Sequence, residues 1–147
     1  MTDADAHYRG LERMYHVAAT INEYFRPELT VGDRTAEVRI GVDPTFFHAA
    51  GAVHGAVYFK AMDDAAFFAA NSIVEDVFVL TSAFHLHFLR PVTEGTLIAR
   101  GTVISATSNL IVADAELSDD RGRLVGRGTG SFMRSTIKLV DVPGYRK

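Results

Sequence analysis

Residues 57–70 form the most apolar stretch of the chain, and they constrain its fold most strongly. In the run VYFKAMDDAAFFAA every residue is apolar except Lys60, Asp63 and Asp64. A helix that is apolar around its whole circumference must be buried on all sides. A single helix wrapped by a curved antiparallel sheet meets this requirement. We therefore expect residues 57–70 to form a central helix on which the rest of the chain packs.

The segments around this run have the patterns of one further helix and of several strands. Residues 1–27 hold apolar side chains at helical spacing, which predicts an N-terminal helix, and RPEL and VGD then break it. Apolar and polar residues alternate in 34–42, as in a half-buried strand. Four more strands are predicted at 77–89, 96–105, 110–117 and 123–134. This order predicts an α+β fold with the helices on one face of an antiparallel sheet.

Composition limits the kind of protein. A chain of 147 residues has the size of one domain, so we expect a single domain over 1–147 with a loosely ordered tail at 137–147. The net charge of −3 provides no basic field that would attract nucleic acid or an anionic membrane. Cysteine is absent, and no apolar run reaches the roughly 20 residues that span a bilayer. We expect a cytoplasmic protein that binds neither nucleic acid nor membrane.

Three segments resemble the PaaI type of hotdog-fold acyl-CoA thioesterase. GAVHGAVYFKAMDDAAFFAA resembles the segment that opens the central helix in this family, FHLHFLRPVTEG a strand that ends in Arg-Pro, and DDRGRLVGRGTGSF the last hairpin. The resemblance runs from about residue 38 to residue 133. It implies a hotdog fold, a curved sheet around a long central helix. It also implies hydrolysis of acyl-CoA at sites shared by two subunits, in a homodimer or homotetramer.

The chain departs from the family pattern at two positions near its histidine, His54. The second glycine after that histidine is Ala56 here, which is a mild change. Six residues before it the family carries Asn, which positions the thioester or the attacking water, and here the residue is His48. The family's Ser or Thr on the following strand corresponds to Thr81. The resemblance thus assigns His48 and Thr81 an orienting role.

Thioester hydrolysis requires hydrogen-bond donors where the oxyanion develops, and a base or nucleophile on the other side of the carbonyl. Gly55 is expected at the start of the central helix, where its N–H has no intrahelical partner and no Cβ blocks a ligand. Asp63 is the candidate base or nucleophile. It follows Gly55 by eight residues, about 12 Å along a helix, so one carbonyl cannot touch both. A second copy of the helix must then supply one of the two groups.

Other polar residues have weaker assignments. Asp64 is expected to pair with Lys60, four residues before it, and His54 to cap or orient the loop before the helix. His85 and His87 are expected at an interface or surface. We predict no metal site, because neither His48 nor His54 has a partner at a known ligand spacing, and we predict no cofactor. The predicted substrate-binding residues are His54, Phe59, Arg90 and Arg134, the two arginines for the CoA phosphates.

Two other functions fit the same residues. A hotdog-fold hydratase or dehydratase also uses a histidine and a carboxylate at a dimer interface, but the two prolines of the dehydratase loop are missing from HAAGAVHG. A non-catalytic acyl-CoA-binding module is the third possibility, although a residue able to act as a base is present. The sequence leaves the acyl group open, and it leaves CoA and an acyl-carrier protein as alternative carriers.

Overall fold

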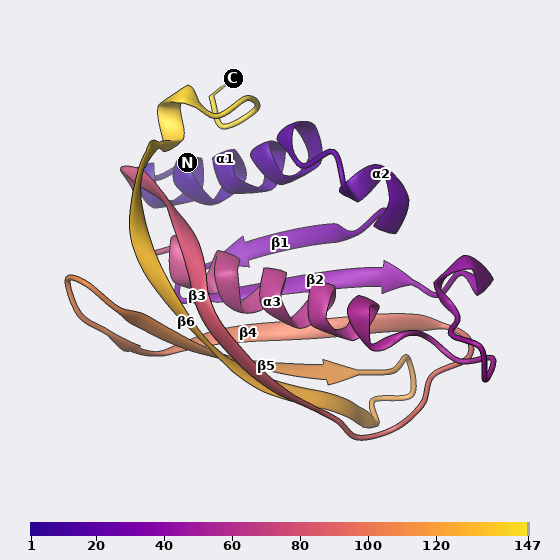
Figure 1. Ribbon diagram of the computed structural model, residues 1–147. Coiled ribbons are helices and arrows are strands. Elements are labelled where there is room, and N and C mark those ends of the chain that lie inside the picture. The colour runs from indigo at the N-terminus through magenta and orange to yellow at the C-terminus, as the bar shows by residue number, and fades with distance from the viewer. Residues whose placement is uncertain (147) are drawn as a thin grey trace.

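The computed structural model describes residues 1–146, which form one curved antiparallel sheet around a central helix (Figure 1). The strand order is β1-β2-β4-β5-β6-β3. The strands are β1 (Glu28–Gly32), β2 (Thr35–Gly41), β3 (Val77–Phe88), β4 (Thr96–Ala106), β5 (Ile111–Ser118) and β6 (Leu124–Lys138). The helices are α1 (Asp3–Ala18), α2 (Asn22–Phe25) and α3 (Gly55–Asn71), with short 3₁₀ turns η1 (Pro44–Phe46) and η2 (Leu139–Asp141).

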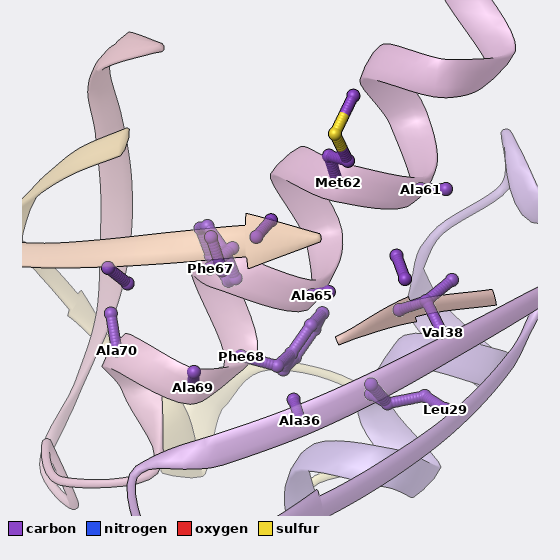
Figure 2. Close-up of a cluster of buried hydrophobic side chains, with 14 of the residues drawn as sticks. Leu29, Ala36, Val38, Ala61, Met62, Ala65, Phe67, Phe68, Ala69 and Ala70 are labelled. Carbon is purple, nitrogen blue, oxygen red and sulfur yellow. The ribbon is translucent and has the colours of Figure 1, made fainter. Parts of the chain in front are cut away.

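Helix α3 lies in the concave face of the sheet and contacts all six strands. Its side chains form the centre of the hydrophobic core, together with Leu29, Ala36 and Val38 from β1 and β2 (Figure 2). The sheet approaches the helix backbone closely at Gly101 of β4, where an added Cβ would lie 2.2 Å from the carbonyl oxygen of Ala65. This arrangement is the predicted hotdog fold, with one helix enclosed by an antiparallel sheet.

The expectation that the central helix is buried on all sides is wrong for the single chain. Ala56 and Phe59 of α3 are exposed, and Lys60 and Asp63 are partly exposed. These residues are spaced three to four apart and so form one stripe along the helix. We call residues 56, 59, 60 and 63 the α3 stripe. It is the part of α3 that the chain's own sheet does not cover.

Strand β1 was not predicted, because Pro27 and Gly32 at its borders indicate a break. The five residues nevertheless alternate exposed and buried side chains, and they pair with β2 across a tight turn. The helix expected within residues 1–27 is confirmed as α1, followed by the single turn of α2. Helix α1 begins with a capping box in which Thr2 and Asp5 bond to each other's backbone N–H.

The C-terminal segment lies against α1, which the expectation of a loose tail over 137–147 did not include. Strand β6 extends to Lys138, and Leu139 after it is fully buried. The hydroxyl of Tyr145 lies 2.6 Å from Nδ1 of His7, and the guanidinium of Arg13 donates to the Tyr145 carbonyl at 2.8 Å. These contacts tie the end of the chain to its first helix. No helix within residues 1–146 is long and apolar enough to cross a membrane.

Candidate active site

The carboxylate of Asp63 and the hydroxyl of Thr81 meet at the middle of α3. The Thr81 hydroxyl donates a hydrogen bond of 2.9 Å to Oδ1 of Asp63. The two residues come from α3 and β3, and both face a cavity of about 530 Å³ that α1 closes from the other side. The structure therefore brings together the candidate base and the hydroxyl that the sequence assigned to orient the reaction.

The pKa of Asp63 is higher in the folded chain than that of an aspartate in water. Burial raises the pKa of Asp63, and so does the nearby charge of Asp64, while the Thr81 hydrogen bond and the Lys60 ammonium lower it. The balance places the pKa of Asp63 at about 6. The carboxylate is thus mostly ionised at neutral pH and yet more basic than an ordinary aspartate, as suits a general base.

Asp64, the adjacent carboxylate, is already engaged. The Lys60 ammonium lies 2.6 Å from its Oδ2, which confirms the predicted pair, and the hydroxyl of Tyr15 donates to the same oxygen at 2.5 Å. Burial and the charge of Asp64 raise the pKa of Tyr15, so this hydroxyl keeps its proton. The contact with Tyr15 was not predicted, because Tyr15 lies 49 residues away in the sequence. Within residues 1–146, Asp64 is bound by both Lys60 and Tyr15, whereas Asp63 accepts a single hydrogen bond, from Thr81.

Asp63 is expected to destabilise the folded chain at neutral pH. Its pKa of about 6 in the folded chain exceeds the ordinary aspartate pKa of 3.8, so folding disfavours the ionised form. We expect Asp63→Asn to raise the free energy of unfolding by up to about 3 kcal/mol above pH 6. Both states are protonated near pH 3, where the gain disappears. Urea unfolding at pH 8 and at pH 3.5, at one protomer concentration, measures this, and equal gains at both values would contradict it.

The first residue of α3 faces a second, separate cavity. Gly55 opens into a space of about 370 Å³ whose walls include His48, Tyr58, Phe88 and Arg90. The side chain of His54, which caps the helix, accepts a hydrogen bond from the N–H of Ala56. No acceptor within residues 1–146 bonds to the N–H of Gly55. This N–H belongs to the positive end of the helix dipole beside the cavity. An added Cβ would lie 2.8 Å from the Phe88 ring, a contact that the sequence did not reveal.

Both histidines before α3 use Nδ1 as an acceptor. His54 Nδ1 accepts the N–H of Ala56 at 2.9 Å, which confirms that His54 caps the helix. His48 Nδ1 accepts the N–H of Ala50 at 3.1 Å. A neutral imidazole that accepts at Nδ1 carries its proton on Nε2. His48, which faces the same cavity as Gly55, therefore has an N–H available for a ligand there.

Three of the four predicted binding residues, His54, Phe59 and Arg134, line neither cavity. Phe59 belongs to the α3 stripe and is 40% exposed, with its ring 5.6 Å from that of Phe84. Arg134 on β6 forms an ion pair of 2.7 Å with Asp76. Arg90, in contrast, does face the Gly55 cavity, and its carbonyl accepts the Tyr58 hydroxyl at 2.6 Å. Of the two arginines considered for the CoA phosphates, only Arg90 is placed beside a candidate site.

His85 and His87 are exposed on β3, with ring centroids 5.1 Å apart. Within residues 1–146 no group of three or more His, Cys, Asp or Glu side chains is arranged to hold a metal ion.

One central helix enclosed by a curved antiparallel sheet is the hotdog fold, which solved thioesterase structures share. The thioesterase superfamily matches residues 50–126, which is more than half of the chain. The chain belongs to the thioesterase superfamily, and its fold is that of the PaaI-like hotdog thioesterases. The match begins just before the capping histidine and includes both cavity-facing segments of α3 and β3.

Solved structures share this fold at low sequence identity. The PaaI protein of E. coli, from the phenylacetic acid degradation operon, superposes with a TM-score of 0.83 at 22% identity, over 93% of this chain and 99% of that one. A thioesterase of Haemophilus influenzae gives a TM-score of 0.77 at 20% identity, over 89% and 90%. A protein of Saccharolobus solfataricus named "putative esterase" is 28% identical over 66% of this chain and 69% of its own length. At these identities the structures establish the fold alone.

Proposed function

We propose that the protein hydrolyses acyl-CoA thioesters at sites that two subunits share. The observation that carries this proposal is the separation of the two reacting groups on one helix. Gly55 and Asp63 are eight residues apart, about 12 Å along α3, and they face different cavities. Asp63 and the N–H of Gly55 therefore cannot reach one carbonyl within a single chain, so a site that uses both requires a second chain.

Two uncovered features of the chain support such a dimer. The α3 stripe is not covered by the chain's own sheet, and its residues Ala56 and Phe59 are exposed. Strand β3 is an edge of the sheet, and along it Leu80 is 48% exposed and Phe88 59% exposed. A two-fold axis beside the stripe would place two α3 helices antiparallel, with Gly55 next to the partner's Asp63. The minimum assembly is a homodimer with two sites, and two such dimers would make a homotetramer.

The proposed reaction places each group at one position around the thioester carbonyl. Ionised Asp63 takes a proton from water while the water oxygen bonds to the carbonyl carbon, and the carbonyl electrons move to oxygen. The N–H of the partner's Gly55 and Nε2–H of the partner's His48 donate to this oxyanion. When the carbonyl re-forms, the C–S bond breaks, and the CoA thiolate receives the proton from Asp63. Direct attack by the Asp63 carboxylate, through an anhydride that water then cleaves, uses the same groups.

His48 is expected to act as a donor to the oxyanion. Because its Nδ1 is occupied by the N–H of Ala50, its Nε2–H is the group left to donate. His48→Asn should keep most activity since the amide also donates, whereas His48→Ala should lower kcat/KM about 10- to 1,000-fold. A pH–rate profile of the wild type and His48→Asn is the measurement. An acid limb that is present in the wild type and absent from His48→Asn would contradict the donor role.

A panel of acyl-CoAs with a thiol reagent tests the proposed function. Thiol release by the wild type, and its loss in Asp63→Asn, are expected. A change in enoyl absorbance without thiol release would indicate a hydratase instead. Binding of acyl-CoA without either signal would indicate a non-catalytic binding module. Repeating the panel with acyl groups on a carrier protein distinguishes the two thioester carriers.

A further inference from the structure

The cavity at Asp63 lies between α3 and the end of α1. Its walls come from α3, from β3 and from the C-terminal segment, and the last turn of α1 with the residues after it closes one side. Ala18 and Ala19 lie in this closing wall. We propose that this end of α1, and Ala18 above all, determines which acyl groups the enzyme accepts. The inference rests on the proposed function, because it concerns the same site.

The chemistry of the walls assigns this cavity to the acyl part of the substrate. Two of its polar residues, Asp63 and Thr81, lie at the reacting position. The other three are Tyr15, Lys60 and Asp64, which bond to one another. All other lining residues are apolar, including Phe67, Phe68 and Phe78. The amide groups of a pantetheine arm would lack hydrogen-bond partners there, whereas an alkyl or aryl acyl group would not. The cavity therefore fits an apolar acyl group larger than acetyl.

Helix α1 is fixed firmly enough to act as a rigid wall. The Tyr15 hydroxyl bonds to Asp64 of α3 at 2.5 Å, and Nε2 of His7 lies 2.8 Å from the carbonyl oxygen of Asn71 at the end of α3. Met14 and Tyr15 are almost completely buried. These two hydrogen bonds hold α1 to α3. The small methyl side chain of Ala18 fills little of the cavity beside it. Because Ala18 lines the cavity, a larger side chain at this position would take up part of its space.

The test is Ala18→Phe, with Val17→Phe as the matched control. Val17 is the adjacent residue of α1, is 63% exposed and does not line the cavity. For Ala18→Phe we expect kcat/KM for octanoyl-CoA to fall about 10- to 100-fold while that for acetyl-CoA stays within about 3-fold. For Val17→Phe both values should match the wild type. Ala18→Leu, a smaller change, should shift the preference in the same direction and guards against misfolding of the phenylalanine variant.

Binding measurements separate this inference from the proposed function. Calorimetric titration of octanoyl-CoA into Asp63→Asn and into Asp63→Asn with Ala18→Phe requires no turnover, and the second protein should bind at least about 10-fold more weakly. If binding is weaker but the wild type releases no thiol, the role of Ala18 in acyl-group selection is supported and the proposed hydrolysis is excluded. Equal losses for octanoyl-CoA and acetyl-CoA in both folded Ala18 variants, or no loss in either, would overturn the assignment of the wall.

Discussion

Asp63→Asn is expected to lower kcat/KM for thioester hydrolysis about 100-fold or more while the oligomer remains folded. The amide preserves the volume of the side chain and still accepts the Thr81 hydroxyl, but it can neither take a proton from water nor attack the carbonyl. In the wild type, kcat/KM should fall as the pH drops through the Asp63 pKa of about 6, because the protonated carboxyl is inactive. Steady-state thiol release between pH 5 and 8 measures both effects.

Asp64→Asn is the matched control for this prediction. The Tyr15 hydroxyl can still donate to the amide, so α1 should stay in place and activity at pH 8 should remain near that of the wild type. Because the charge of Asp64 raises the pKa of Asp63, its removal should move the acid limb to lower pH. If the two variants lose similar activity, or if Asp64→Asn loses more, the assignment of the base to Asp63 is wrong.

Mixing two inactive variants is expected to restore activity if the sites are shared. Gly55→Pro removes the free N–H, and the position suits proline because it is the first of the helix and follows His54 in an extended conformation, with ψ 143°. Loss of one oxyanion donor lowers kcat about 100- to 1,000-fold. After subunit exchange with Asp63→Asn, half of the dimers are hybrids with one intact site, so about a quarter of wild-type activity should return.

Gly55→Ala separates the loss of the N–H from the presence of a side chain. It keeps the donor and adds only a Cβ, against a Phe88 ring that is 59% exposed and free to move. Gly55→Ala should therefore be much more active than Gly55→Pro. Hybrids whose formation is shown by native mass spectrometry but which remain inactive would exclude the shared site.

The parts of the site that the sequence predicted are those set by local spacing. The start of the central helix at Gly55, its capping by His54 and the pair of Lys60 with Asp64 depend on neighbours within four residues. The hydrogen bond between Asp63 and Thr81 spans 18 residues and was not predicted, although the family resemblance assigned Thr81 an orienting role. The sequence also predicted the sheet and the central helix, because alternation along strands and a wholly apolar helix are both readable without an alignment.

The features that were missed depend on packing between distant segments. Tyr15 touches Asp64 and Phe88 covers Gly55 only because the fold brings α1 and the end of β3 to the two ends of the α3 stripe. No periodicity within α1 distinguishes the residues that face the cavity from those in the core. The short β1 was hidden for another reason, since turn residues at its borders outweigh five strand residues.

Strand β3 is an edge of the sheet, so the assembly of the protein affects its tendency to aggregate. An exposed edge strand is a template for pairing with any other chain, and proteins usually protect such edges. In the proposed dimer the partner protects the edge and completes the active site at once. A substitution that loosens subunit contact would then produce aggregation-prone protomers as well as inactive ones. Selection against aggregation would thus act on the same subunit contact on which the proposed shared site depends.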